Sequence, residues 1–463
     1  MPKDFRDFLS ILEESGELKR VSAEVNPKHE LGAVCALVNS KKESPAIVFE
    51  NVSGSKIPVV SQLLASNRRI ALSLGVREEE VFEKMVERSQ KRIATKSVSK
   101  DKAPCQEVVL TGEEVDLRKL PICTNNPGDG GPYITAGHVF LKDPEIGQNL
   151  SIYRMMYYSK NEVFIRLTPG HDGYDFFKNA ERRDDKRLEV AVAIGVDPAI
   201  YIASQFEPAL GVYELEMAGG LKQEPIDVVR CESVDLEVPS RSEIILEGEL
   251  TIPPKTDAEG PIGEFCGYTT DRVPGERIMR IKAMTHRMSP LYHNIWLGRP
   301  PHEHLYVDAL SFGVQAYNEL HPVYGAIKRA YAPPWGVSLA LVIQIDEHLK
   351  RPGVVGNILG ASLATRSGKW KYVVAVDDDI NIYDPNEVLW AITTRFQPHR
   401  DSFVIPWGST SRLEPSSDPE GVTSKLFIDA TKKKDFRGTV AEPTEELRSR
   451  VKSRWKEFSS LDK

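Results

Sequence analysis

The sequence predicts a mixed α/β protein whose central region is rich in strands. Helical and strand-like patterns alternate over residues 1–105, and they alternate again from residue 298 to the end. Between them, strand-like segments follow one another with only two helical interruptions. Alternation of strands and helices is typical of a largely parallel sheet, whereas dense short strands indicate a barrel or sandwich. We therefore expect an N-terminal α/β region (1–105), a strand-rich domain (106–297) and a C-terminal α/β domain (298–463).

The N-terminal region begins with an amphipathic helix. Asp4 is a good N-cap, Gly16 is a good terminator, and the apolar residues between them recur at helical spacing. Further patterns predict strands at 18–25 and 45–52, helices at 29–40 and 77–90, and a polar linker at 96–104.

The central region contains strand patterns with two helical interruptions. The strands are expected at 107–112, 136–143, 149–158, 162–169, 188–196, 243–252 and 277–286, and the helices at 174–183 and 212–221.

The C-terminal region predicts helices at 304–320, 354–366 and 386–395, with strands at 337–345 and 371–380. The chain after Arg437 is charged, but it carries Val451, Trp455 and Phe458 at roughly helical spacing. An apolar stripe of this kind needs a surface to cover it. We therefore expect a homo-oligomer in which the tail takes part.

Composition excludes several classes of function. Sixty basic residues against 67 acidic ones give a net charge of −7, which argues against nucleic acid as the main partner. The sequence shows no signal-peptide pattern and no apolar run long enough to span a membrane. Its five cysteines are scattered and lack CxxC spacing, so we expect reduced thiols in a cytoplasmic protein. P-loop, dinucleotide, zinc-protease and serine-hydrolase motifs are also missing.

Two glutamates in the segment Glu259-Gly-Pro-Ile-Gly-Glu264 are the strongest candidates for chemistry. Gly and Pro favour a turn that brings both side chains to one site. Phe265 and Cys266 follow directly, and apolar neighbours favour the protonated form of Glu264, which suits a proton donor. The alternative is an ordinary solvated loop.

Polar residues also gather in the central region, and each has an ordinary structural alternative. Arg154 lies in an apolar strand and needs an anionic partner, which is either a structural carboxylate or a bound ligand. Asn, His and Glu side chains suit a hard or borderline divalent ion that shares a phosphate. The group comprises Asn149, Ser151, Arg154, His171, Ser204, Glu214 and Glu216.

Two further clusters are interpreted mainly as structural. Asp377 to Asp379 end a predicted strand, where α/β sheets place ligands, but capping of the next turn is the favoured interpretation. His302-Glu303-His304 could bind metal, but adjacent helical residues point in different directions. We expect this second cluster to line or guard a pocket.

Several long segments together resemble one family. They are NLSIYR (149–154), ASQFEPALGVYELEMAGGL (203–221), EGPIGEFCGY (259–268), GRPP (298–301), KYVVAVDDDIN (371–381) and LWAITTR (389–395). In this order they resemble the UbiD family of prenylated-FMN-dependent (de)carboxylases over nearly the whole chain. The resemblance implies an N-terminal α/β region, a central split β-barrel that binds flavin and metal, and a C-terminal α/β domain.

The resemblance also implies roles for individual residues. Arg154, Glu259 and Glu264 would form the catalytic network, and Lys371 would face the cofactor. The metal set would be Asn149, His171 and Glu214 for Mn²⁺ or another divalent ion such as Mg²⁺, with Ala203, Ser204, Phe206 and Glu214 for K⁺. The implied cofactor-binding residues are Asn149, Ser151, Ile152, Tyr153, Arg154, Ser204, Phe206, Glu214 and Lys371.

The implied reaction is reversible, non-oxidative decarboxylation of an aromatic, possibly phenolic, or α,β-unsaturated acid. Loss of CO₂ from an sp² carbon requires an electron sink, which the modified flavin supplies, and Glu264 would deliver the replacing proton. A flavin prenyltransferase would supply the cofactor, and the assembly would be a dimer or hexamer. The expected substrate wall contains His302, His304, Tyr324 and Trp335.

Three alternatives remain open at this stage. The chain could be a non-catalytic or accessory subunit of a multi-subunit aryl carboxylase. It could instead decarboxylate a polyprenylated hydroxybenzoate or another non-aromatic enoic acid. A plain FMN oxidoreductase is disfavoured for two reasons. The sequence has no nicotinamide-binding signature, and it contains the EGPIGE segment.

Overall fold

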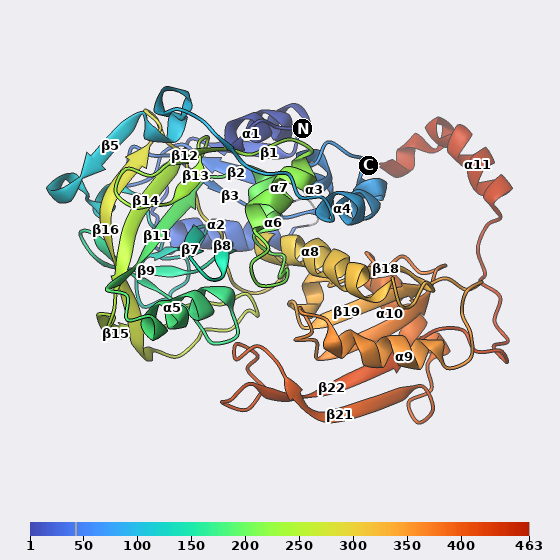
Figure 1. Cartoon of the computed structure of the whole chain (residues 1–463). Coiled ribbons are helices and arrows are strands. Elements are labelled where there is room, and N and C mark those ends of the chain that lie inside the picture. The colour runs from blue at the N-terminus through green and yellow to red at the C-terminus, as the bar shows by residue number, and fades with distance from the viewer. Residues whose placement is uncertain (42–43, 463) are drawn as a thin grey trace.

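The computed structural model describes residues 1–41 and 44–462 and has a mixed α/β fold. Figure 1 shows the N-terminal and central elements packed together on one side and the C-terminal sheet on the other. Helix α8 (Glu303–Leu320) runs between the two parts. This arrangement agrees with the predicted succession of an α/β region, a strand-rich region and a second α/β region.

The N-terminal helix α1 (Phe5–Glu14) begins as predicted. Asp4 accepts hydrogen bonds from the backbone N–H groups of Arg6 and Asp7, which satisfies two donors that a helix start leaves free. The helix packs its apolar side against a four-stranded sheet. The remaining N-terminal elements are β1 (Leu18–Val21), β2 (Ala46–Phe49), β3 (Val59–Ser61), α2 (Glu30–Asn39), α3 (Asn67–Ser73) and α4 (Val81–Ser89).

The fourth strand of this sheet, β17 (Tyr292–His293), comes from a distant part of the chain. Residues 96–104, predicted to be a polar linker, form a second connection between the N-terminal and central regions, because part of this segment is a strand. Lys96–Ser97 form β4, which pairs in parallel with β12 (Asp227–Arg230), and β13 (Glu237–Pro239) completes this sheet. An edge strand of this kind requires backbone groups rather than apolar side chains, so composition did not reveal it.

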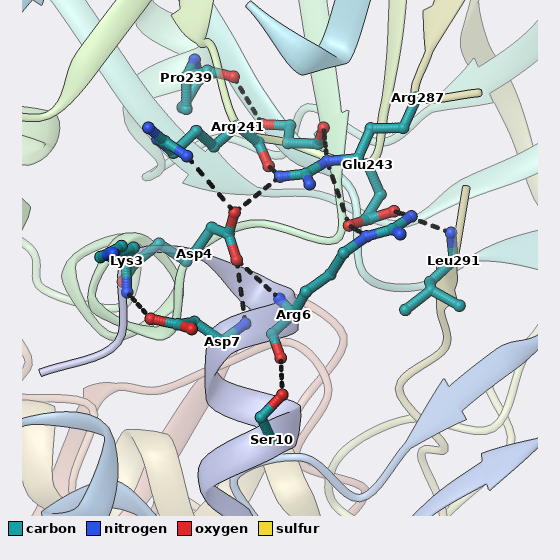
Figure 2. A network of polar contacts seen from close by, with 12 residues as sticks. Lys3, Asp4, Arg6, Asp7, Ser10, Pro239, Arg241, Glu243, Arg287 and Leu291 are labelled. Carbon is teal, nitrogen blue, oxygen red and sulfur yellow. Dashed lines mark hydrogen bonds and ion pairs between the residues drawn. The ribbon is translucent and has the colours of Figure 1, made fainter. Parts of the chain in front are cut away.

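A buried ion network ties α1 to the central sheet (Figure 2). The fully buried carboxylate of Glu243 accepts hydrogen bonds from Arg6 Nε and Nη2 at 2.8 and 2.7 Å. Arg287 lies 3.3 Å from the same carboxylate and donates to Asp4 Oδ2 at 3.0 Å. The cap of the first helix is therefore also a contact with the central region.

The central region is built on a ten-stranded sheet. Its long strand β16 (Val273–His286) pairs with four others, and the recorded pairings do not join the end strands β6 and β8. A closed barrel is therefore not observed among the described residues, and the split barrel stays a prediction. The other strands are β5 (Val108–Thr111), β6 (Tyr133–Ile134), β7 (His138–Asp143), β8 (Gly147–Ile152), β9 (Met155–Ser159), β10 (Glu162–Ile165), β11 (Arg187–Ile194), β14 (Ile244–Thr251) and β15 (Thr256–Glu259).

The single strand predicted at 149–158 is wrong, because the chain forms two strands there. β8 pairs with β7, and β9 pairs with β6 and β10. Tyr153 and Arg154 lie at the break between them. The apolar pattern runs through both strands, so it does not reveal that the chain changes its pairing partner. The break brings Arg154 to the site described below.

Three helices interrupt the central strands. They are α5 (Asp172–Arg182), α6 (Pro198–Ala203) and α7 (Glu214–Lys222). The prediction included α5 and α7 but not α6, which is only six residues long and almost entirely buried. Asp197 caps α6, and Pro198 occupies its first turn, where the missing N–H costs nothing.

The C-terminal sheet is parallel at its centre and antiparallel at both edges. Its order is β18 (Ile327–Tyr331), β19 (Ala340–Ile345), β20 (Tyr372–Asp377), β22 (Val422–Asp429) and β21 (Ser402–Ser409). Helices α9 (Val354–Ala361) and α10 (Pro385–Arg395) accompany it. β21 was not predicted, because its exposed edge position leaves no regular apolar pattern.

The chain ends in α11 (Glu445–Ser453) and a short 3₁₀ segment (Trp455–Asp462). Figure 1 shows α11 in red at the end of an extended segment, away from the C-terminal sheet. Val451, Trp455 and Phe458 are 40%, 44% and 38% exposed. Among the described residues, no helix is both long and apolar enough to cross a membrane.

Candidate active site

The structure brings Arg154, Glu259 and Glu264 together in one ion cluster. Arg154 donates from Nε and Nη2 to the two oxygens of Glu259 at 3.2 and 3.0 Å, and from Nη1 to Glu264 Oε1. The two glutamates are only 1% and 5% exposed. A bidentate guanidinium–carboxylate pair fixes both side chains in one plane, so the geometry of this cluster is well defined.

The turn between the two glutamates directs both carboxylates to Arg154. Glu259 ends β15, and Gly260 follows with φ of +96°, where a Cβ would lie 2.9 Å from the carbonyl oxygen of Asp271. Glu264 begins a second tight turn, in which its N–H donates to Tyr268 O at 2.9 Å. Only glycine suits the left-handed backbone and the close approach at position 260.

The loop at 126–130 supports this turn from outside. Asp129 accepts hydrogen bonds from the N–H groups of Gly263 and Asn126, both at 2.8 Å. The N–H of Gly130 donates to Pro261 O at 2.7 Å. The loop at 126–130 therefore holds the glutamate turn in place.

A second arginine, Arg166, completes the cluster and was not predicted. Its Nη1 lies 2.8 Å from Glu276 and 3.9 Å from Glu259. Among these ion-paired groups, two guanidinium groups face three carboxyl groups, so their full ionisation leaves one excess negative charge within the set. Burying an uncompensated charge is costly, and one proton on a carboxyl group removes it. The cluster is thus suited to holding a transferable proton.

A cavity of about 410 Å³ lies between the central and C-terminal regions and reaches the cluster through Tyr153 and Phe265, the chain neighbours of Arg154 and Glu264. Arg154, Glu259 and Glu264 themselves lie behind this wall. Seven of the predicted cofactor and metal residues line it: Ser151, Ile152, Tyr153, His171, Ser204, Phe206 and Glu214. Phe265, which follows Glu264, is also part of the wall. The cavity is lined by both polar and apolar groups, as expected for a cofactor site.

Glu214, the first residue of α7, is a buried carboxylate at the base of this cavity. It accepts hydrogen bonds from Leu150 N–H at 2.7 Å and from Asn149 Nδ2 at 3.2 Å. Burial raises its pKa to about 8, and the two hydrogen bonds it accepts come from an amide and a backbone N–H, which carry no charge. A bound cation would supply the missing positive charge.

Asp172 is a further acidic residue near the Glu214 carboxylate, and it was not predicted as a site residue. Asn149 Nδ2 lies 3.4 Å from Asp172 Oδ2, so the amide is placed between two carboxylates. His171 is exposed where α5 begins. Over the residues that the structure describes, no three His, Cys, Asp or Glu side chains are already grouped as metal ligands. Glu214, Asn149 and Asp172 nevertheless offer oxygen donors of the kind that a hard divalent ion prefers, and His171 lines the rim of the cavity.

Comparison with known proteins identifies the family. Three consecutive parts of the chain match family models described as 3-octaprenyl-4-hydroxybenzoate carboxy-lyase domains: N-terminal over 9–89, Rift-related over 96–300 and C-terminal over 313–430. The chain belongs to the UbiD family. It is therefore a UbiD-type carboxy-lyase.

Solved structures of UbiD enzymes match nearly the whole chain. HmfF from Pelotomaculum thermopropionicum, solved with FMN, is 36% identical with a TM-score of 0.87, covering 96% of this chain and 98% of its own. Vanillic acid decarboxylase of Sedimentibacter hydroxybenzoicus in closed form is 30% identical, with a TM-score of 0.87 and coverage of 98% and 99%. The 3,4-dihydroxybenzoic acid decarboxylase AroY of Klebsiella pneumoniae is 27% identical, with a TM-score of 0.87 and coverage of 97% and 99%.

The lysine and the potassium-binding residues that the UbiD resemblance implies do not all line the cavity. Lys371 does not line it, but is ion-paired with Glu414. Lys369, two residues earlier, does line it and lies 3.0 Å from Glu207. Ser204 and Phe206 are in the cavity wall, whereas Ala203 is buried behind it at the end of α6. The group of basic residues just before β20 was the feature of the sequence that could have pointed to Lys369 as a cavity residue.

Of the four residues expected in the substrate wall, His304 lines the cavity of this UbiD protein. His302 is fully buried behind the wall. Tyr324 packs on the apolar core near the far end of α8, and Trp335 is largely exposed. An 18-residue helix is about 27 Å long, so Tyr324, just beyond the far end of α8, does not reach the cavity at its start.

The three aspartates at the end of β20 do not line the cavity. Asp377 is fully buried and is paired with Lys350 and Arg395. Asp379 accepts two hydrogen bonds from Arg395 at 2.8 and 2.9 Å. Their contacts are structural, in agreement with the favoured interpretation.

Proposed function

We propose that this protein catalyses reversible, non-oxidative decarboxylation of an aromatic, possibly phenolic, or α,β-unsaturated acid with prenylated FMN. The observation that carries the proposal is the Arg154–Glu259–Glu264 cluster beside a cavity lined by the expected cofactor residues. HmfF has been solved with FMN and, in an evolved dimeric form, with prFMN. Two other relatives are named for aromatic acids.

The residues around the cavity fit the cofactor and its ions. Glu214, Asn149 and His171 would hold Mn²⁺, or another divalent ion such as Mg²⁺, against the flavin phosphate. Ser204, with Ala203, Phe206 and Glu214, would hold K⁺. We assign cofactor and metal binding to a domain at 106–297 of split-barrel type, flanked by 1–105 and 298–463. A flavin prenyltransferase would supply the cofactor, whose chemistry is to accept the electron pair released when CO₂ leaves.

Glu264 acts as the proton donor in this proposal. Its carboxyl group holds the proton that replaces CO₂ on the substrate carbon, as a positioned general acid does. Arg154 orients it through Nη1 and fixes Glu259 beside it through the two-fold hydrogen bond. In the reverse direction the Glu264 carboxylate takes the proton back, which allows carboxylation at high CO₂ concentration.

The decisive experiment is a mass spectrum of the native cofactor, followed by a CO₂-release screen across aryl and acrylic acids. Protein made together with a flavin prenyltransferase should carry prenylated FMN and release CO₂ from one class. Protein made without that enzyme should bind FMN or no flavin and be inactive. Full activity in the second preparation would overturn the cofactor assignment.

We also propose a homo-oligomer, a dimer or a hexamer, in which the tail covers an apolar surface of a neighbouring copy. The exposed fractions of Val451 and Phe458 support this part of the proposal.

The assembled catalytic cluster favours an enzyme over a purely accessory subunit.

A further inference from the structure

The N-cap residue of α8 and the first two residues of the helix direct their side chains to three different parts of the molecule. His304 lines the cavity. Glu303 is buried, accepts a hydrogen bond from Leu63 N–H at 3.0 Å, and lies 3.1 Å from His293 Nε2. His302 reaches the turn that carries Glu264. One helical turn therefore connects the cavity, the N-terminal sheet and the catalytic loop.

His302 forms a single, well-defined hydrogen bond. Its Nε2 lies 3.1 Å from the carbonyl oxygen of Phe265, and its ring is fully buried, edge to face with Trp296. Burial, assisted by the nearby His304, lowers the pKa of His302 to about 3, so the imidazole is neutral. Because a carbonyl oxygen only accepts, the proton must be on Nε2. Nδ1 has no partner in the described structure.

Phe265 connects this hydrogen bond to the catalytic carboxylate. Its N–H donates to Glu264 Oε2 at 3.3 Å, while its ring lines the cavity. The same turn rests on the GRPP segment, because a Cβ at Gly267 would lie 3.2 Å from Pro300 Cδ. The turn is thus packed from behind by the chain that leads into α8, and its carbonyl is held by His302.

The geometry points to His302 as the positioning residue for Glu264, acting through the carbonyl of Phe265. This inference rests on the proposed role of Glu264 as proton donor. His302 is buried behind the cavity wall, so its effect is to set where the carboxyl group lies. Displacing a reacting group by about 1 Å costs on the order of 100-fold in rate. Loss of the hydrogen bond should therefore lower kcat and leave KM nearly unchanged.

The test compares His302→Gln with His302→Asn in the holoenzyme. The terminal amide of glutamine can place a donor where Nε2 lies, whereas asparagine is too short and mimics Nδ1. His302→Asn should lower kcat on the order of 100-fold with KM within about a factor of two, and His302→Gln should recover most of the loss. His321→Gln is the matched control, because His321 contacts a carbonyl, Ile327 O, at 2.9 Å beyond the other end of α8. It should not change kcat.

A second readout needs neither cofactor nor substrate. Hydrogen–deuterium exchange of apoprotein peptides should quicken at 264–268 in His302→Asn, and not in His302→Gln or the His321 control. Thermal unfolding is measured first, and His302→Leu replaces the asparagine variant if that variant does not fold. Equal kcat and equal exchange in His302→Gln and in His302→Asn, or in the leucine variant that replaces it, would overturn the inference. If Glu264→Gln proves active, the proton-donor role fails, while the exchange comparison still decides whether His302 holds the loop.

Discussion

Replacing Glu264 with glutamine should abolish turnover while leaving the site assembled. Glutamine keeps a carbonyl oxygen for Arg154 Nη1 and removes the acidic proton. It also reduces the cluster from two guanidinium and three carboxyl groups to two of each, so no unbalanced charge is created. Loss of a positioned general acid costs roughly 10²–10⁴-fold in rate. We expect kcat to fall by that amount, with cofactor loading and stability close to wild type.

Glu259→Gln provides the contrast, because it should fail for another reason. It removes the carboxylate that receives two hydrogen bonds from Arg154, and breaking such a buried pair costs about 3 kcal/mol of stability or more. Arg154 would then pair with Glu264 alone and favour its ionised form. The residual activity should therefore increase as the pH is lowered, whereas Glu264→Gln should stay inactive at every pH.

The assay measures CO₂ release and deuterium incorporation from D₂O into the product, on protein with verified cofactor content. Chemical denaturation of each variant gives the change in the free energy of unfolding. Near-normal turnover and deuterium incorporation in Glu264→Gln, with an inactive Glu259→Gln, would reverse the two roles. A loss of flavin in Glu264→Gln would instead assign that carboxylate to cofactor binding.

Three further predictions concern the metal, the first helix and the tail. Glu214→Ala should lower bound metal and flavin absorbance before it affects folding, and unchanged metal analysis would contradict the ligand role. Burial alone would raise the pKa of Asp4, but hydrogen bonds from the Asp7 N–H and from Arg287 hold this pKa below its usual 3.8. The stability that Asp4 contributes is therefore present above that value and lost as the pH falls through the lower folded-state pKa, and Asp4→Asn should remove this acid-dependent part in denaturant titrations. Deleting residues 437–463 should reduce the mass measured by light scattering, and a full-length monomer at micromolar concentration would contradict the oligomer.

The sequence revealed those parts of the fold and site that depend on local patterns. The helix after Asp4 and the turn between Glu259 and Glu264 follow from capping and Gly-Pro-Gly chemistry, and both can be recognised within a few residues. The edge strand β4 and the short helix α6 escaped because neither needs a distinctive apolar pattern. Local propensity is a weak guide wherever tertiary pairing decides the structure.

The site residues that were not predicted from the sequence were missed for a different reason. Arg166 follows β10, Asp172 begins α5 and Lys369 precedes β20, so the three residues reach the site only through the fold. Each belongs to a residue type that is usually solvated, so the apolar segment around Arg166 and the basic residues around Lys369 did not single them out. Arg154 was found because its strand is apolar, although the strand break that aims it was not predicted. Arg166 lies in a similar apolar segment, so this signal alone does not identify every charged residue of the site.

The turn that carries Glu264 is held by contacts from the central region and from two separate parts of the C-terminal domain. The central loop at 126–130 binds its start through Asp129, and His302 at the start of α8 holds Phe265. The thiol of Cys266 donates to Leu413 O at 3.0 Å, which adds a second contact from the C-terminal domain. A proton donor requires placement within a fraction of an ångström, and a short Gly-rich turn alone cannot provide such rigidity. Long-range hydrogen bonds must provide it, so substitutions that weaken them should act on kcat before KM.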